Sequence, residues 1–373
     1  MKSLSRTYAG LPVLVTGHTG FKGSWLSEWL LLLGAEVHGL ALEPDTDPSL
    51  FRQLGLAKRL NHMVADIRDP EAVRAAFAAA RPRIVFHLAA QPLVRRSYQQ
   101  PQETFATNVM GTSHVLDGVR TCDHPCVAVV VTSDKCYENL EGGRDYREGD
   151  ALGGHDCYSA SKAAAEIVTS AYRRSFFLND PGKRIASVRA GNVIGGGDWA
   201  EDRIVPDCLR HLQRGEPISV RNPHATRPWQ HVLEPLGGYL ELASRLLEGP
   251  IQGEGSPNDA AYAAFNFGPG PESERSVQDL VEEVLKSWSG AWENKSDPSA
   301  PHEANRLSLD ISKAARVLDW RPHWDFTRTV CETVEWYRAA QSFSGSSDFQ
   351  KFTREQIEEY STIEAERSVK ALP

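Results

Sequence analysis

Basic residues, cysteines and metal-ligand clusters are scarce in this 373-residue sequence, and each scarcity excludes a class of protein. Lys and Arg number 41 against 49 Asp and Glu, and the resulting net charge of −8 argues against nucleic-acid binding. Cys122 and Cys126 form a CxxxC pair, but no second pair or histidine cluster completes a metal site. The six scattered cysteines suit a reducing compartment.

A long uninterrupted apolar run is also absent. Residues 25–42 form the longest apolar stretch, but Glu28, Glu36 and His38 interrupt it. The stretch is therefore interpreted as a buried helix followed by a strand, and no membrane association is expected. Residues 1–10 are polar and contain no signal-peptide core, so the expected location is the cytoplasm.

Short β-rich runs alternate with helical patterns through the first half of the chain. Strands are predicted at 11–16, 36–40, 83–87, 126–132 and 184–189, and helices at 23–33, 69–80, 104–120 and 159–177. This alternation predicts an α/β fold with a Rossmann-like, doubly wound parallel sheet that helices cover on both faces.

A glycine-rich loop follows the first predicted strand and opens the first long helix. Its glycines have the spacing GxxGxxG. The first allows a tight turn, the second lets the backbone approach a pyrophosphate, and the third lets helix and strand pack closely. The helix N-terminus then offers N–H groups to phosphates. The predicted dinucleotide contacts in this loop are Gly17, Thr19, Gly20, Phe21, Lys22 and Gly23.

The ends of the next two strands bear on the choice of dinucleotide. An acidic residue about 20 positions after the loop is expected to bind the ribose. Glu43 stands slightly late for this role, and a surface carboxylate is the equal alternative. No arginine stands at this strand end, which favours NAD over NADP. Asp66 and Ile67 are expected to contact the adenine, and Asp69 to cap the helix that follows.

Glycine and proline become more frequent after about residue 190, which predicts a second region. Residues 1–190 are expected to bind NAD, with segments near 232–248 and 266–268 returning to the same domain. Residues 191–340 are expected to form mainly a smaller, interleaved substrate domain. The polar C-terminal tail, 341–373, is expected to be helical in part and loosely held.

Tyr158 and Lys162 form a YxxxK pair at the start of a predicted helix. The i, i+4 spacing places the phenol and the ammonium on one face. A nearby cation favours the phenolate, so the pKa of Tyr158 is expected to fall toward that of a working base. The apolar strand 126–132 runs into Ser133 and Asp134, and ligands of parallel sheets bind at such strand ends. These polar groups are therefore expected to meet Tyr158.

Taken together, these motifs resemble those of the extended short-chain dehydrogenase/reductase superfamily, over residues 13–336. The resemblance adds segments 87–90, 107–112, 189–192 and 227–229 to the motifs above. It implies NAD as the cofactor, with Ala89, Ala90 and Asn108 beside it and Lys162 on the nicotinamide ribose. It also implies dimerisation through two long helices, here 104–120 and 159–177, without separating a homodimer from a homotetramer.

Within the superfamily, segments 17–26, 132–137, 192–203 and 227–232 are similar to the CDP-glucose 4,6-dehydratase family. The resemblance implies a nucleotide-sugar substrate, CDP-glucose, that is converted into CDP-4-keto-6-deoxyglucose and water. The NAD would stay bound and be regenerated in each turnover. The product would serve deoxysugar biosynthesis of the O-antigen, or lipopolysaccharide, type.

The resemblance also implies roles for single residues. Tyr158 would take the proton of the sugar 4-hydroxyl, Ser133 would hydrogen-bond the same oxygen, and Asp134 would protonate the leaving C6 oxygen. Related dehydratases continue with a Glu that removes the C5 proton, whereas this sequence has Lys135. Lys135 would act as that base when neutral, or would stabilise the enolate oxygen as a cation. The expected substrate-binding residues are Asn192, Arg203, Arg221 and Arg227.

Two alternatives stay open. A 4-epimerase, or a dehydratase for another nucleotide, would have the same fold, although an epimerase needs no acid such as Asp134 for the C6 oxygen. A non-catalytic NAD-binding regulator could dispense with Tyr158 and Lys162, both of which this sequence retains.

Overall fold

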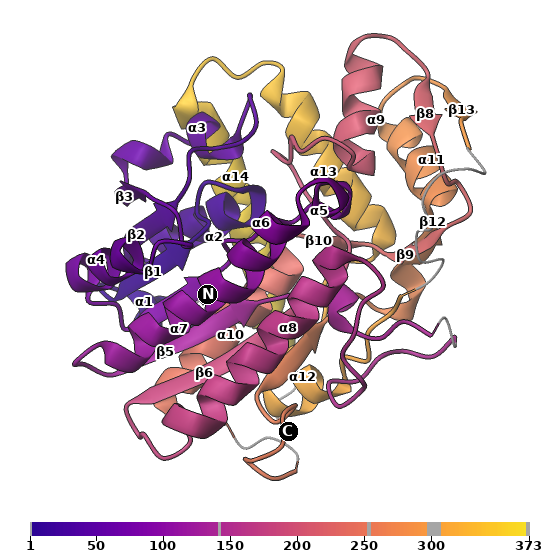
Figure 1. The fold of residues 1–373 in the computed structure, drawn as a ribbon. Helices are drawn as coiled ribbons and strands as arrows, with labels where there is room; N and C mark the ends of the chain where they lie inside the picture. The colour runs from indigo at the N-terminus through magenta and orange to yellow at the C-terminus, as the bar shows by residue number, and fades with distance from the viewer. Residues whose placement is uncertain (1, 141–142, 252–254, 297–306, 371–373) are drawn as a thin grey trace.

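A sheet of seven parallel strands forms the centre of the protein, whose computed structural model describes residues 2–140, 143–251, 255–296 and 307–370 (Figure 1). The strand order is β11-β6-β5-β4-β1-β2-β3. The strands are β1 (Pro12–Thr16), β2 (Glu36–Ala41), β3 (Asn61–Val64), β4 (Ile84–His87), β5 (Cys126–Val131), β6 (Lys183–Ala190) and β11 (Ala264–Phe267). The predicted doubly wound α/β fold is therefore confirmed, and β11 joins its sheet from the second half of the chain.

Helices cover both faces of this sheet because both faces are apolar. In β5, Val127 and Val129 belong to the hydrophobic cluster of one face, and Ala128 and Val130 to that of the other. The first cluster includes residues of α2 (Phe21–Leu32) and α10 (Leu233–Glu248), and the second includes residues of α4 (Pro70–Ala80) and α7 (Thr112–Thr121). α8 (Cys157–Tyr172) lies beside α7, as Figure 1 shows. The side chain of Asp69 caps α4, as predicted.

The helix predicted at 104–120 is a continuous run of α6 (Pro101–Phe105), η2 (Ala106–Gly111) and α7. η2 is a π turn, a local widening of the helix that occurs frequently at functional sites. Asn108 lies buried in this turn, and its Nδ2 donates a hydrogen bond to Ser161 Oγ of α8 at 2.8 Å. The π turn therefore ties the first of the two long helices to the one that carries Tyr158.

The smaller region, at the upper right of Figure 1, is built from short elements of the second half of the chain. Two-stranded sheets pair β7 (Val193–Ile194) with β10 (Gln230–His231), β8 (Ile218–Val220) with β13 (Trp292–Asn294), and β9 (Thr226–Pro228) with β12 (Glu274–Ser276). The helices α9 (Ile204–Gln213) and α11 (Val277–Ser287) belong to the same region. The remaining elements are α1 (Lys2–Tyr8), α3 (Leu50–Gln53), η1 (Leu56–Lys58), α5 (Val94–Gln99), η3 (Asp134–Cys136), η4 (Arg173–Phe177), η5 (Pro271–Ser273), α12 (Ser312–Val317), α13 (Phe326–Ala340) and α14 (Ser346–Lys370).

The C-terminal helix α14 corrects the expectation of a loosely held tail. Thr353, Ile357 and Tyr360 are fully buried, and α14 packs beside α2. Glu28 of α2, itself fully buried, accepts hydrogen bonds from Arg59 at 2.6 and 2.8 Å and from Arg354 of α14 at 2.6 Å. The polar composition that suggested a loose tail thus includes the residues that bind α14 to the fold. Among the described residues, no helix has the length and apolarity needed to cross a bilayer.

The buried carboxylate of Glu28 yields a stability prediction. Glu28→Gln removes its charge and leaves two guanidinium groups without their partner. Because breaking a buried ion pair on one side is strongly destabilising, we expect a loss of about 3 kcal/mol in the free energy of unfolding. Arg59 and Arg354 are 20% and 37% exposed and regain some hydration, which keeps the loss near the low end for such pairs. Urea denaturation measures it, and an unchanged midpoint contradicts the prediction.

Candidate active site

The predicted site residues gather at the carboxyl ends of the central strands. The strand order reverses between β1 and β4, and ligands of such sheets bind in the crevice at this switch point. The glycine loop follows β1, residues 88–90 follow β4, Ser133 and Asp134 follow β5, and Asn192 follows β6. The parallel sheet therefore brings together segments that lie more than 170 positions apart in the sequence.

The backbone of the glycine loop fits a dinucleotide. Gly17 has φ +76°, and a Cβ there would lie 2.6 Å from the backbone nitrogen of Ala89. A Cβ on Gly23 would collide with the carbonyl oxygen of Gly17. Gly20 precedes α2, whose first turn has no side-chain cap, so no side chain at the cap position uses its N–H groups and they suit an anion. Thr19 Oγ1 donates to Leu42 O at 2.9 Å, which fastens the loop to the end of β2.

At the expected adenine end, the predicted residues are held by their own neighbours. Asp66 forms an ion pair with Arg68 at 2.6 Å, and the carbonyl of the buried Ile67 bonds to the ring of His114 at 2.9 Å. Glu43 is 63% exposed and lies 3.9 Å from Arg52. This position fits the surface-carboxylate alternative for Glu43.

A pair of histidines beneath the glycine loop was not found from the sequence. His18 is fully buried, and its Nε2 lies 2.7 Å from Nδ1 of His62. A Cβ on Gly39 of β2 would collide with the His18 ring, so that glycine makes room for the imidazole. Burial, and then the neighbouring His62, lower the pKa of His18 to about 3. A glycine inside an apolar strand signals such a close approach, and was the available clue.

The catalytic candidates lie together at the end of β5 and the start of α8. Tyr158 is buried and shares a hydrogen bond with Ser133. Ser133 Oγ donates to Asp134 Oδ1 at 2.9 Å, and Lys135 Nζ lies 3.3 Å from the same oxygen. Asp134 Oδ2 is buried and has no hydrogen-bond partner among the described residues. A buried carboxylate oxygen without a partner is a candidate contact for a ligand.

The electrostatics of Tyr158 correct one expectation. Burial raises the pKa of Tyr158 above its usual value, and Lys135, Ser133 and Arg203 offset this only in part. Lys162 donates to Val131 O at 3.4 Å, and burial lowers its own pKa to about 8. The expected net lowering of the Tyr158 pKa by Lys162 is therefore wrong for this structure, because desolvation of the phenol outweighs the nearby cations.

Several charged groups nevertheless act on Lys22 at this edge of the sheet. The half-buried Lys22 is influenced by Arg203, Asp134, Lys162 and Lys135, and burial followed by the charge of Arg203 lowers its pKa to about 7. A local cluster of positive charge in a protein of net charge −8 attracts an anionic ligand to that place. The described residues contain no group of three or more His, Cys, Asp or Glu that could hold a metal ion.

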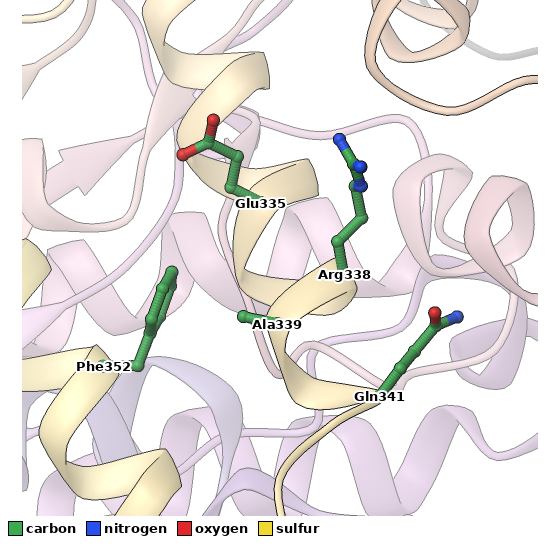
Figure 2. A pocket seen from close by; sticks show the side chains of 5 residues that line it. All are labelled: Glu335, Arg338, Ala339, Gln341 and Phe352. Atoms are coloured by element: carbon green, nitrogen blue, oxygen red, sulfur yellow. The ribbon is translucent and has the colours of Figure 1, made fainter.

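The candidate substrate residues divide into two sets. Arg203 pairs with the buried Asp198 at 3.0 Å and acts on Tyr158, so it belongs to the catalytic side. Arg221 instead pairs with Asp202 at 2.9 Å. Of the remaining two, Arg227 donates to Thr226 O at 2.9 Å, and Asn192 Oδ1 is buried with no partner among the described residues. A separate hollow lies on α13 and α14, and Figure 2 shows the side chains that line it: Glu335, Arg338, Ala339, Gln341 and Phe352. None of the candidate substrate-binding or catalytic residues lines this hollow.

Known proteins are similar to this chain in sequence and in fold. The sequence model of the GDP-mannose 4,6 dehydratase family matches residues 14–333. The chain is 48% identical over 339 residues to the CDP-glucose 4,6-dehydratase of Salmonella typhimurium, which covers 89% of this chain and 92% of that protein.

Two solved structures show the same fold at lower identity. One is a UDP-glucose 4-epimerase from Thermotoga maritima with UDP-glucose, with a TM-score of 0.73, 22% identity, and coverage of 88% of this chain and 99% of that one. The other is a dTDP-glucose 4,6-dehydratase from Bacillus anthracis in complex with NAD, with a TM-score of 0.72, 19% identity, and coverage of 90% and 98%. The chain therefore belongs to the GDP-mannose 4,6 dehydratase family, within the extended short-chain dehydrogenase/reductase superfamily that its motifs indicate.

Proposed function

We propose that the protein is an NAD-dependent hydro-lyase that converts CDP-glucose into CDP-4-keto-6-deoxyglucose and water. The observation that carries this proposal is the convergence of Ser133, Asp134 and Lys135 on Tyr158 at the end of β5. A phenol that acts as a base is sufficient for oxidation of one hydroxyl group. Loss of a second hydroxyl group as water also requires an acid nearby, such as a carboxyl group. The identity of 48% to a CDP-glucose 4,6-dehydratase supports cytidine as the nucleoside.

The residues at the switch point fit NAD. The loop from Gly17 to Gly23 and the N-terminus of α2 would hold the pyrophosphate, and Asp66 and Ile67 would lie at the adenine. Bound NAD supplies a hydride acceptor for C4 of the sugar and a hydride donor for C6. Lys162 would hold the nicotinamide ribose, with Ala89, Ala90 and Asn108 nearby. Because each turnover returns the cofactor to its starting state, the reaction does not require its release, and we expect it to remain bound.

Tyr158 and Ser133 act on the sugar 4-hydroxyl. Tyr158 would remove its proton, and its hydrogen bond to Ser133 places the two hydroxyl groups side by side. Because burial raises the pKa of the phenol, this role requires the bound substrate and cofactor to add to the stabilisation of the phenolate that Lys135, Ser133 and Arg203 supply in part. The 4-ketone then acidifies the proton at C5. Asp134, whose Oδ2 has no partner among the described residues, is the group for the departing C6 oxygen.

Lys135 is left with two roles. Its side chain is 37% exposed and pairs with Asp134 at 3.3 Å. The role as a base depends on a buried, neutral amine, whereas stabilisation of the enolate oxygen needs only a cation in reach. The exposure and the pairing support the second role, whereas the C5 proton needs an acceptor that the first role supplies, so both roles are retained for Lys135.

Arg203, Arg221 and Arg227 would bind the diphosphate, with Asn192 on the diphosphate or the adjacent sugar. Guanidinium groups suit this task because they bind phosphate oxygens in bidentate fashion. We retain the division into an NAD-binding part, 1–190, a mainly substrate-binding part, 191–340, and a C-terminal part, 341–373. The six free cysteines support a reducing compartment, and we propose the cytoplasm. Deoxysugar biosynthesis of the O-antigen type is the proposed use of the product.

We further propose a homo-oligomer built on the two long helices. Phe105, Met110, Ile167 and Phe176 are large apolar side chains that are 38%, 52%, 56% and 51% exposed. They lie on the helical runs from α6 to α7 and from α8 to η4, which are side by side in Figure 1. Exposed apolar surface on paired helices favours burial against a second copy.

The first test is turnover of CDP-glucose by the purified protein, followed by mass spectrometry and NMR. We expect loss of one water and a new C6 methyl group without added NAD. Turnover of a UDP-, dTDP- or GDP-sugar instead contradicts the choice of CDP. Binding of NAD without turnover of any of them supports the non-catalytic regulator, and 4-epimerisation supports the epimerase.

Asp134→Asn is expected to separate the two halves of the reaction. Tyr158 and Ser133 remain, so oxidation at C4 continues, while loss of the C6 oxygen slows by about 100-fold because general acids contribute 10²- to 10⁴-fold. Absorbance at 340 nm should show reduced cofactor that accumulates. Tyr158→Phe is the matched variant: it should fail to oxidise C4, so no absorbance at 340 nm should appear. Equal effects of both variants on oxidation contradict the role assigned to Asp134.

Met110→Glu and Ile167→Glu are expected to yield monomers. Each places a charge in the proposed interface, while the exposed position of either side chain leaves the monomer fold unaffected. Light scattering measures the mass, and Leu140→Glu is the control because Leu140 is 78% exposed and lies outside these helices. An unchanged oligomer in both variants places the interface elsewhere.

A further inference from the structure

Glu166 is a buried carboxylate on α8, one turn after Lys162. Glu166 has no role in the reaction proposed above. Its Oε1 accepts a hydrogen bond from Thr132 Oγ1. Its Oε2 accepts bonds from Ser187 Oγ at 2.7 Å and from Arg189 Nη2 at 2.8 Å. Thr132 directly precedes Ser133, so Glu166 fixes the start of the catalytic segment 132–137.

Arg189 fixes the other end of the same segment. Its guanidinium lies 4.8 Å from the centre of the Tyr137 ring and donates to the Tyr137 hydroxyl at 2.8 Å. The Tyr137 hydroxyl donates in turn to Asn266 Oδ1 of β11 at 2.7 Å. The Glu166–Arg189 pair thus spans the segment that carries Ser133, Asp134 and Lys135.

Stability alone does not explain a pair of this kind. The side chains of Arg189 and Glu166 are only 2% and 3% exposed. The loss of hydration of two such charges offsets most of their attraction, and apolar residues of similar volume often stabilise a core as well or better. We therefore look for the role of this ion pair in the reaction and not in stability.

The charge of Glu166 acts on Lys162. Among the described residues, the ionisable groups whose charges act on Lys162, or on which its charge acts, are Cys136 on η3, Glu166 on α8, His87 on β4 and Lys22 on α2. Burial raises the pKa of the Cys136 thiol and lowers the pKa of His87 to about 3, so both are neutral near pH 7. Lys22 has the same charge sign as Lys162. Of these described groups, Glu166 is therefore the anion whose charge opposes the effect of desolvation on Lys162.

We propose that Glu166 is a positioning residue for the reaction: with Arg189 it holds the catalytic segment in place, and its charge keeps Lys162 cationic. The proposal rests on the proposed function, because the cation matters only if Lys162 serves the bound cofactor and Tyr158. It assigns Glu166 no contact with the substrate.

The test compares Glu166→Gln with the wild-type protein across pH. Lys162 is charged below its pKa of about 8, so activity that needs this cation declines as the pH rises through that value. Removal of the Glu166 charge lowers the pKa of Lys162, and the alkaline decline of kcat should move down by about 1 pH unit. At pH 8 this shift corresponds to a kcat about five-fold lower. The ¹³Cε chemical shift of Lys162, assigned with Lys162→Met, should show the same displacement without any turnover.

Two further variants keep the test decisive. Glu166→Gln leaves Arg189 buried and unpaired, so Glu166→Gln/Arg189→Met provides a version expected to fold and to shift in the same direction. Glu28→Gln removes the charge of another fully buried carboxylate that is not among the groups acting on Lys162. It should lower stability and leave the alkaline decline in place.

The outcomes separate this proposal from the proposed function. Folded Glu166 variants with an unchanged Lys162 titration and an unchanged alkaline decline overturn the role of Glu166. A wild-type protein that does not turn over CDP-glucose contradicts the proposed function, and the Lys162 titration then still decides whether Glu166 controls its charge. A shift that Glu28→Gln reproduces reports general loss of stability and overturns the proposal.

Discussion

The close approach of two backbone segments at the switch point is the constraint on which the rest of the site depends. Gly17 lies so near the nitrogen of Ala89 that a Cβ would stand 2.6 Å from it, and Gly23 packs against the carbonyl of Gly17. The loop after β1 therefore reaches the end of β4 and leads directly into α2. The remaining site segments follow from this, because parallel strands deliver β5 and β6 to the same edge of the sheet.

Desolvation sets the chemistry at that edge. The same burial that brings Tyr158 against Ser133 raises the pKa of its phenol, and lowers the pKa of Lys22 and Lys162 to about 7 and about 8. The pKa values of these two lysines thus lie close to neutral pH, where a small change in surroundings alters their charge. Their state depends on the carboxylates that face them, and these are themselves fixed by hydrogen bonds. An arrangement of this kind responds strongly to the arrival of an anionic ligand.

The C-terminal helices also support Arg203, one of the residues proposed to bind the substrate. Trp336 Nε1 of α13 donates to Thr353 Oγ1 of α14 at 3.1 Å, and the Tyr337 hydroxyl donates to the carbonyl of Asp198. The carboxylate of Asp198 in turn pairs with Arg203 at 3.0 Å. A chain of contacts therefore connects the last helix with Arg203, a cation of the candidate active site, although α14 lies beyond the residues that the family model matches.

The sequence by itself determined the class of fold and which segments meet in the candidate site, because both depend on local patterns. Apolar strands, glycine spacing and the i, i+4 pair of Tyr158 and Lys162 are properties of neighbouring residues, and strand ends of a parallel sheet must converge. Only the tertiary structure decided the direction of the Tyr158 pKa, the pairing of Glu166 with Arg189 and the docking of α14. Each of these depends on burial and on partners 20 or more positions away, as from Glu166 to Arg189 or from Glu28 to Arg354. Desolvation is a property of the packed fold, and no pattern of adjacent residues determines it.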